Sequence, residues 1–374
     1  MEPIPVSRPS LGEEELDAVR RVFSTGWLGL GADVLEFEKA LGRFLGAPNV
    51  LCTSTGTTAL HLALDALGIG PGDEVLLPSL TYVASAQAVS ATGARPVFCD
   101  VGEGDLNIDV EDARGRVTPR TKAILPVHYR GIPCDLDGIR ELAADHDLHV
   151  VEDAAHAFGS SYRGEMIGSS TEVACFSFDP IKNITCGEGG AVVFRDAGLL
   201  ERLQQKRILG IDKDTWSRYR NERSWFYDVV TQGYRYHMSN ISAAIGLVQI
   251  GKFGRMNRRK IEVARRYDEA FGDLDGVELL ENAGYRDIGL FAYMVRVRSH
   301  RNELMDYLGA RGVGTGVHYI PSHLFSFYHE EGLVLPVTER MYREILSLPL
   351  FADITDEQVE RVIQGVTSGI RELA

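Results

Sequence analysis

The chain has 374 residues, of which 44% are hydrophobic, and a formal net charge of −14. One hydrophobic core seldom serves more than about 250 to 300 residues, so the length predicts two domains. The strong negative charge argues against general binding of nucleic acids or acidic membranes, because it repels other polyanions.

The N-terminal residues lack the basic start and apolar run of a signal peptide, and no uncharged apolar stretch is long enough to span a bilayer. We therefore expect a cytoplasmic protein without membrane association. The cysteines are widely spaced and form no C-x-x-C pair, so we expect neither a disulfide framework nor a metal site.

Along the chain, residues 13–23 read as an amphipathic helix with an acidic first turn. Short apolar runs then alternate with helical patterns. The predicted strands cover 50–52, 74–77, 96–99, 123–127 and 148–153, and the predicted helices begin near Thr57, Val83, Val110 and Leu136. This alternation predicts an α/β fold with a mostly parallel sheet flanked by helices, in which ligands bind at the carboxyl ends of the strands.

The first strand end carries a run of hydroxyl residues around one glycine, Gly56, directly before a helix. Free backbone N–H groups and the positive end of the helix dipole meet hydroxyl groups such as that of Thr57 there, which suits a phosphate group. An ordinary helix N-cap explains the same residues. The G-x-x-x-x-G-K-S/T pattern of nucleotide hydrolases is missing, which favours a monophosphate over a triphosphate.

Two aromatic residues at later strand ends are candidates for contact with a planar cofactor. Tyr82 follows the second strand, where it can stack on a ring or simply pack in the core. His156 lies just beyond Asp153 and can lie against a ring or pair with that carboxylate. The sequence leaves both alternatives open.

Lys182 stands in a glycine-rich turn between two apolar strands, 173–176 and 191–194, with Ser177 directly after the first strand. Burial lowers the pKa of a lysine and makes its neutral, nucleophilic amine accessible at about pH 7, as a Schiff-base lysine requires. Alternatively, a lysine here simply extends from a strand end to water. Asp153 favours the first interpretation, because an acid and a lysine at neighbouring strand ends can hold opposite ends of pyridoxal phosphate.

After residue 196, the sequence predicts a helix at 199–208, a polar, mobile or partner-facing loop at 212–225, an apolar helix at 241–249 and a basic helix at 255–271. Further on, it predicts a strand at 291–297, a helix at 302–310, a strand ending at 318–319, and helices at 338–346 and 355–370. His318, Tyr319 and His323 are interpreted as polar groups at a substrate mouth, because two histidines without an acid are poor metal ligands. The small residues of 241–249 indicate close helix packing, which a dimer interface can supply.

Several stretches, taken in order, resemble the sugar aminotransferases of the DegT/DnrJ/EryC1/StrS family, a branch of the fold-type I pyridoxal-phosphate enzymes. They are Gly26–Gly31, Ser54–Thr57, Val151–His156, Ser177–Gly190, Gly233–Ala244 and Val317–Pro321, and they extend over nearly the whole chain. The resemblance implies a mostly parallel central sheet flanked by helices. We expect residues 1–250 to form the large cofactor-binding domain, with the N-terminal helix and active-site loop, and residues 251–374 a small α+β domain.

The resemblance also implies roles for individual residues. Lys182 and Asp153 would be catalytic, Gly56, Thr57 and Ser177 would bind the cofactor phosphate, and Tyr82 and His156 would lie against its ring. Arg235 stands where the family commonly has an asparagine that reaches the phosphate from the other subunit, so the resemblance implies a homodimer with shared sites. His237 stands where the family has arginine, and Asp179 where many members have histidine or tyrosine.

For the reaction, the resemblance implies transfer of an amino group from glutamate to a nucleotide-linked keto sugar. The motif Asn183-x-Thr185-x-Gly187-Glu188-Gly189 is more similar to the motif of members that act on 4-keto sugars. A 4-keto-6-deoxyhexose is therefore the first expectation, and a 3-keto sugar is the second. A sugar dehydratase of the same fold is disfavoured, because such members replace the lysine that stands at 182. A non-catalytic protein that senses pyridoxal phosphate is a further alternative.

Overall fold

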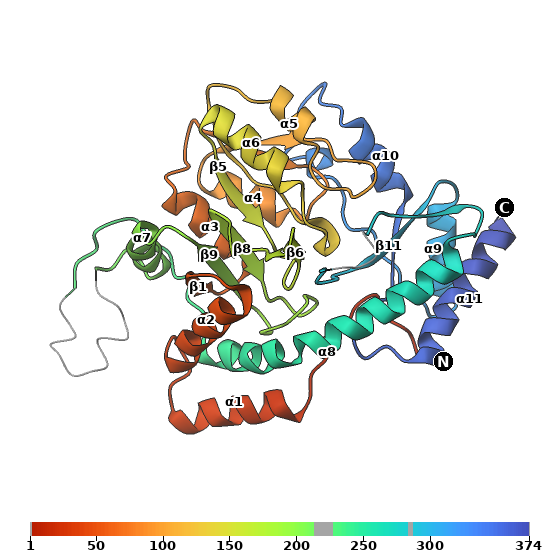
Figure 1. The fold of residues 1–374 in the computed structure, drawn as a ribbon, viewed down its shortest axis with the longest axis horizontal. Helices are drawn as coiled ribbons and strands as arrows, with labels where there is room; N and C mark the ends of the chain where they lie inside the picture. The colour runs from red at the N-terminus through yellow and green to blue at the C-terminus, as the bar shows by residue number, and fades with distance from the viewer. Residues whose placement is uncertain (1, 213–226, 283–286, 374) are drawn as a thin grey trace.

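The computed structural model describes residues 2–212, 227–282 and 287–373. The polar loop predicted at 212–225 therefore falls, apart from its first residue, outside the described residues. A large sheet covered by helices fills one part of the molecule, and a smaller sheet lies near both chain ends (Figure 1).

The central sheet confirms the predicted mostly parallel α/β fold. Its strands are β1 (Asn49–Thr53), β2 (Glu74–Pro78), β3 (Arg95–Cys99), β4 (Thr121–Ile124), β5 (His149–Asp153), β8 (Val173–Ser177) and β9 (Gly190–Phe194). They lie in the order β1-β9-β8-β5-β4-β2-β3, in which every neighbouring pair is parallel except those that involve β9. Parallel strands end at the same edge, so β5 and β8 carry Asp153 and Ser177 to one side of the sheet.

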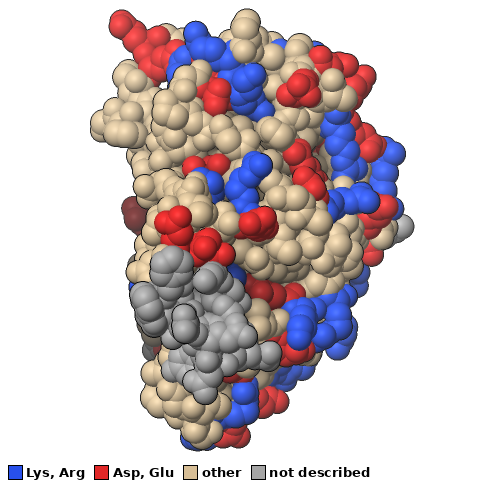
Figure 2. All heavy atoms as spheres, turned by 90° about the vertical axis from the view of Figure 1, so that its left-hand side faces the viewer, with Lys and Arg blue, Asp and Glu red and all other residues tan. Residues whose placement is uncertain are grey.

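Helices lie before, between and after these strands, and all of them except α2 fall where the sequence predicts a helix. They are α1 (Glu13–Thr25), α2 (Ala32–Leu45), α3 (Gly56–Ala66), α4 (Ala84–Ala91), α5 (Val110–Gly115), α6 (Leu136–His146) and α7 (Gly198–Arg207). A short hairpin of β6 (Ser161–Tyr162) and β7 (Glu165–Met166) precedes β8. On the face that carries α7, acidic and basic side chains are interspersed among uncharged ones (Figure 2).

One long helix, α8 (Asn240–Phe271), replaces the two helices that the sequence predicts at 241–249 and 255–271. The expected break is wrong because each glycine between the two patterns costs only about 1 kcal/mol in a helix interior. Between them lies Phe253, which is buried. Its ring packs against those of Phe44 and Phe158, at centroid distances of 5.4 and 5.3 Å, and this packing holds the helix continuous.

The small residues at the start of α8 permit close packing inside this chain. A Cβ atom added to Gly246 would lie 2.5 Å from the Phe37 ring of α2 and 2.6 Å from the Cys186 sulfur. The predicted close helix packing is therefore found between α8 and its own chain.

The smaller sheet contains β10 (Val277–Leu279), β11 (Tyr293–Val297) and β12 (Ile345–Leu348), all antiparallel, and the helices beside it are α9 (Arg301–Ala310), α10 (Pro336–Glu344) and α11 (Asp356–Leu373). The helix predicted at 338–346 ends two residues early, because β12 begins at Ile345.

The strand predicted to end at 318–319 is wrong, since only isolated bridges form there. Val313 pairs with Ile4, and Gly316 pairs with Ser347. Ile4 is buried in the hydrophobic core of the smaller sheet, so the N-terminal segment packs with the C-terminal part of the chain. The domain boundary at residue 250 stays a prediction. No helix within the described ranges is long and apolar enough to cross a membrane.

Candidate active site

A cavity of about 370 Å³ lies at the carboxyl ends of β5 and β8, beside the first turns of α3 and α4. Most of the residues that the sequence predicts for the site line this cavity. They are Gly56, Thr57, Tyr82, Asp153, His156, Ser177, Lys182, His318 and Tyr319. The structure thus brings together in one cavity residues that the sequence places on five separate segments.

Asp153 ends β5 beside Cys175 of β8 and is only 4% exposed. Its carboxylate accepts a hydrogen bond from the Ser85 hydroxyl (2.7 Å) and another from the backbone N–H of Ala155 (3.1 Å). Burial raises the pKa of Asp153, while these donors and the charge of Lys182 oppose that rise. The carboxylate is therefore held in place and can pair with a positively charged group in the cavity.

Lys182 lies in the loop that follows β8, where a turn fixes its backbone. Its N–H donates to the carbonyl of Asp179 (3.1 Å), and the N–H of Ile181 donates to the carboxylate of the same residue (3.0 Å). The Nζ atom lies 4.6 Å from the centroid of the Phe291 ring. Burial lowers the pKa of Lys182 to about 8 against the opposing charges of Asp153 and Asp179, so about a tenth of the amine is neutral at pH 7.

The start of α3 and the end of β8 touch each other and form a cradle for an anion. A Cβ atom added to Gly56 would lie 2.7 Å from the Cβ of Ser177. Thr55 serves as the N-cap, accepting the N–H of Thr58 at 3.1 Å. The hydroxyls of Thr57 and Ser177 line the cavity and make no hydrogen bond to the described residues. Helix capping therefore uses only part of the predicted hydroxyl run, and the rest can receive a phosphate.

Tyr82 and His156 flank the cavity in different ways. Tyr82 is 56% exposed, so it is not a core residue, and its ring lies 5.5 Å from that of Tyr319. His156 stacks on Phe291 at 4.0 Å, and its Nε2 lies 3.1 Å from the Tyr319 hydroxyl.

His156 does not make the hydrogen bond to Asp153 that the sequence left open, because its Nε2 bonds Tyr319 and the carboxylate of Asp153 is held by Ser85 and Ala155. Burial lowers the pKa of His156 far below its usual value, so the ring is neutral. Its Nδ1 is buried and has no hydrogen-bond partner among the described residues. That nitrogen is available to a polar atom of a bound ligand.

His318 and Tyr319 line the cavity as predicted, whereas His323 and Arg235 do not. His323 is buried, and its Nδ1 lies 2.7 Å from the Ser79 hydroxyl, away from the cavity lining. Arg235 is exposed, in a segment that pairs with Ile208. Burial and the charge of Lys182 lower the pKa of His318 to about 4, so His318 is neutral at pH 7.

The sequence does not predict the roles of Ser85, which lines the cavity, and of Phe291, which contacts two residues of its lining. Ser85 orients the carboxylate of Asp153, and Phe291 lies under both His156 and Lys182. Ser85 sits in an ordinary helical pattern after Tyr82, and Phe291 lies in a segment that only the tertiary fold brings near. Neither position carries a signal in the sequence.

The chemical groups that line the cavity are complementary to those of pyridoxal phosphate. It offers an anion cradle at Gly56 and Ser177, a buried carboxylate at Asp153, an amine of lowered pKa at Lys182 and an unpartnered ring nitrogen at His156. A phosphate, a pyridine nitrogen, an aldehyde and a phenolic oxygen are the complementary groups of that cofactor.

Comparison with known proteins identifies the family. The sequence pattern of the DegT/DnrJ/EryC1/StrS aminotransferase family matches residues 9–367. The spore coat polysaccharide biosynthesis protein SpsC of Bacillus subtilis is 38% identical over 97% of this chain and 96% of its own. The aminotransferase TlmJ of Streptoalloteichus hindustanus is 39% identical and superposes with a TM-score of 0.93 over 100% of both chains.

Spr1654 of Streptococcus pneumoniae, solved in a PLP form, is 28% identical and superposes with a TM-score of 0.92 over 100% of both chains. Both the sequence pattern and the fold thus extend over nearly the whole chain. The protein with this cavity belongs to the DegT/DnrJ/EryC1/StrS aminotransferase family, whose members depend on pyridoxal phosphate.

Proposed function

We propose that this aminotransferase moves an amino group from glutamate to a nucleotide-linked keto sugar with bound pyridoxal phosphate. The observation that carries the proposal is the placement of Lys182 and Asp153 at the ends of the adjacent strands β8 and β5, on one cavity with an anion cradle. The similarity to SpsC, a polysaccharide biosynthesis protein, supports a sugar as the amino acceptor.

In this proposal the cofactor phosphate is held by the backbone of Gly56 and the hydroxyls of Thr57 and Ser177. Asp153 faces the pyridine nitrogen, and Tyr82 and His156 lie beside the ring. When bound, the cofactor supplies an electron sink for the negative charge that develops on a substrate carbon.

The amine of Lys182 has two tasks. Its neutral form would bind the aldehyde group of the cofactor, and the pKa of about 8 makes some of this form available at neutral pH. As a free amine, the same Nζ would serve as the acid and base that moves a proton to and from the substrate carbon. Phe291 beneath Nζ keeps this amine in a shielded position.

Asp153 would favour a protonated ring nitrogen in the bound cofactor. Its carboxylate is fixed by Ser85 and Ala155, so it presents negative charge toward the cavity in one orientation. A buried carboxylate of raised pKa gains most from a protonated partner, since a neutral partner would leave its charge unpaired.

His318 and Tyr319 are proposed to contact the sugar, because they line the cavity from the C-terminal part of the chain. Asp179 and Glu188 also line it, and their carboxylates can accept hydrogen bonds from sugar hydroxyls. The motif that includes Asn183 and Glu188 supports a 4-keto-6-deoxyhexose as the first candidate and a 3-keto sugar as the second.

A homodimer with shared sites is part of the proposal. Arg235 is exposed and does not line the cavity of its own chain, and Leu209, Val229 and Val230 nearby are 42%, 58% and 52% exposed. Exposed apolar side chains that cluster around an arginine form a surface suited to contact with a second copy of the chain. Arg235 would then reach the cofactor phosphate of the partner subunit.

The decisive test of the function is product analysis. The purified protein is incubated with isotopically labelled glutamate and a panel of nucleotide-linked 3-keto and 4-keto sugars, and products are identified by mass spectrometry. Label in a 4-amino sugar supports the first candidate, and label in a 3-amino sugar supports the second. An unchanged visible spectrum with glutamate and other amino donors would instead favour a non-catalytic sensor of pyridoxal phosphate.

A further inference from the structure

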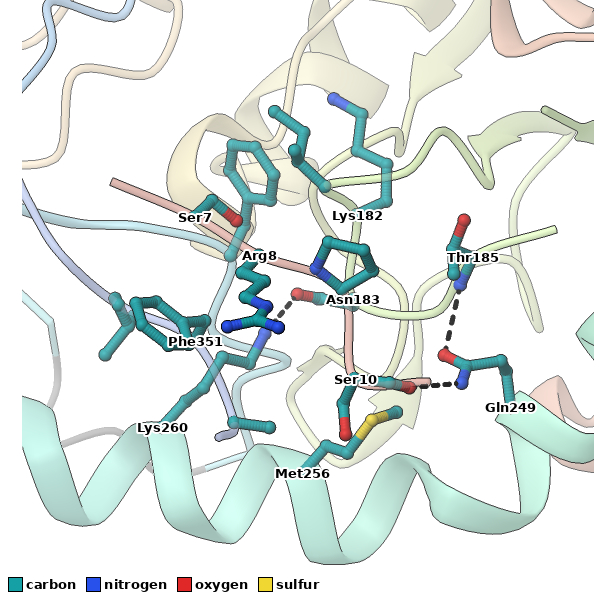
Figure 3. A pocket seen from close by; sticks show the side chains of 15 residues that line it. Ser7, Arg8, Ser10, Lys182, Asn183, Thr185, Gln249, Met256, Lys260 and Phe351 are labelled. Carbon is teal, nitrogen blue, oxygen red and sulfur yellow. Dashed lines mark hydrogen bonds between the residues drawn. The ribbon is translucent and has the colours of Figure 1, made fainter. Parts of the chain in front are cut away.

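A second, smaller cavity of about 30 Å³ lies behind the Lys182 loop, between residues 7–10 and α8 (Figure 3). In Figure 3 the amine of Lys182 points away from this cavity, whereas the side chains of Asn183 and Lys260 meet within it. Its lining includes the cations Arg8, Lys182 and Lys260, and the lining residues include no acid.

Asn183, the residue that follows Lys182, is the centre of a buried hydrogen-bond network. Its Nδ2 donates to the carbonyls of His156 (3.2 Å), Phe158 (3.0 Å) and Gly289 (2.8 Å). Its Oδ1 accepts a hydrogen bond of 2.7 Å from the Nζ of Lys260 in α8. One side chain thus ties the Lys182 loop to the segment after β5, to residue 289 and to α8.

Lys260 is an unusual residue for this position. It is 7% exposed and makes no ion pair within the described part of the chain. Burial alone lowers its pKa to about 7. Two other cations of α8 are paired with acids, Lys252 with Glu14 and Glu15, and Arg259 with Asp356. Keeping a lone buried amine is costly, so a specific use of it is expected.

We propose that Lys260 is a positioning residue that acts through Asn183 to hold Lys182 in its shielded place in the main cavity. The proposal rests on the proposed role of Lys182. The bond from Lys260 fixes the oxygen side of the Asn183 amide, which leaves the NH₂ side directed at the three carbonyls. The backbone of the Lys182 loop is thereby clamped between α8 and the wall that carries His156 and Phe291.

Loss of the clamp changes the environment of Lys182 in a predictable direction. The charged or titratable groups that interact with Lys182 are Asp153, Asp179, His156 and His318, and they remain in place. A looser loop admits water to the amine. Because burial is the main cause of the low pKa of Lys182, hydration raises that pKa toward the ordinary lysine value.

The test measures the amine of Lys182 in the protein without cofactor, so it does not depend on transamination. Lysines are reductively methylated over a range of pH, and the labelling of each lysine is read by peptide mass spectrometry. The variants are Lys260→Met, Lys260→Arg and Asn183→Ser. Lys252→Met is the matched control, because it removes a lysine of the same helix that is paired with acids.

In Lys260→Met and Asn183→Ser we expect the labelling midpoint of Lys182 to rise by at least one pH unit. This lowers its labelling at neutral pH about tenfold. Lys260→Arg should retain the wild-type midpoint, since it keeps a charged donor, and Lys252→Met should leave it unchanged. Either folded variant with the wild-type midpoint overturns the proposal, as does a wild-type Lys182 that labels like a surface lysine. A purely structural role would lower the melting temperature without moving the midpoint.

Discussion

The cavities on the two sides of the Lys182 loop differ in what surrounds a buried amine. In front, Lys182 faces Asp153 and Asp179 in about 370 Å³ of space. Behind, Lys260 faces no acid among the lining residues, in about 30 Å³, and bonds to an amide. Burial lowers both pKa values, but only the front cavity has room for a substrate. This difference agrees with the proposed roles, in which Lys182 reacts and Lys260 holds the loop that carries it.

The largest effect is expected where the reacting amine is removed. Lys182→Ala should reduce transamination by at least about a thousandfold, because it deletes the nucleophile and the proton carrier. The measurement is the rate of amino transfer from glutamate. A variant that retains normal turnover would contradict the assignment of Lys182.

Stability provides the control for that variant. The folded pKa of Lys182, about 8, lies below its unfolded value, so the amine disfavours folding below pH 8, and stability rises with pH between the two values. Lys182→Ala should therefore unfold at pH 7 no more easily than the wild type, as thermal unfolding followed by circular dichroism will show.

The next largest effect is expected from substitution of Asp153, the acid of the front cavity. Asp153→Asn keeps the shape but removes the charge that holds the proton on the cofactor nitrogen, so we expect the half-reaction with glutamate to slow about a hundredfold or more. Stopped-flow absorbance measures this step. Ser85→Ala is the matched variant, since it only removes a hydrogen bond to the carboxylate, and a smaller loss is expected.

The front cavity, unlike the rear one, is proposed to need a second chain. Arg235→Ala should weaken cofactor binding about tenfold, as expected for a charge-assisted hydrogen bond. Co-expression with Lys182→Ala sharpens the test, because a mixed dimer with shared sites contains one site with both side chains intact. Recovery of activity in mixed dimers supports sharing, and no recovery contradicts it.

The pKa of Lys182 predicts a pH dependence for the front cavity. Below pH 8 the protonated amine cannot attack the aldehyde, so cofactor uptake by the cofactor-free protein should rise about tenfold per pH unit up to pH 8 and then level off. His318, with a pKa of about 4, does not titrate in this range. A rise that continues at the same slope well above pH 8 would show that the pKa of the amine is not lowered.

The smallest effects concern the two histidines at 318 and 323. His318→Gln should raise the KM for the keto sugar about tenfold by loss of a polar contact. His323→Gln should leave KM nearly unchanged, because His323 bonds Ser79 away from the cavity lining. Steady-state kinetics on both variants compare them directly, and an equal rise of KM in both would place His323 at the substrate.

The sequence predicts the parts of this molecule that depend on local patterns. Alternating apolar runs locate the strands, and their polar ends locate Asp153, Ser177 and Lys182, because parallel strands share one edge. It cannot predict contacts that arise only from tertiary packing. Phe253 keeps α8 continuous by packing on distant rings, and Phe291 reaches Lys182 from a segment more than a hundred residues away.

The histidines show the same limit at finer scale. His318 and His323 look equivalent in the sequence, yet the first lines the cavity and the second turns toward Ser79. Side-chain direction depends on where the backbone of this segment bends, and residue type alone does not carry that information.

The continuity of α8 restricts how the enzyme can move. Its 32 residues form a rod of roughly 48 Å, whose first half carries Phe253 in the core of the large sheet and whose second half carries Tyr267 in the core of the small one. Hinge bending between the two halves would have to break backbone hydrogen bonds inside the rod. We therefore expect substrate access to depend on surface loops, with α8 joining the two cores as one frame.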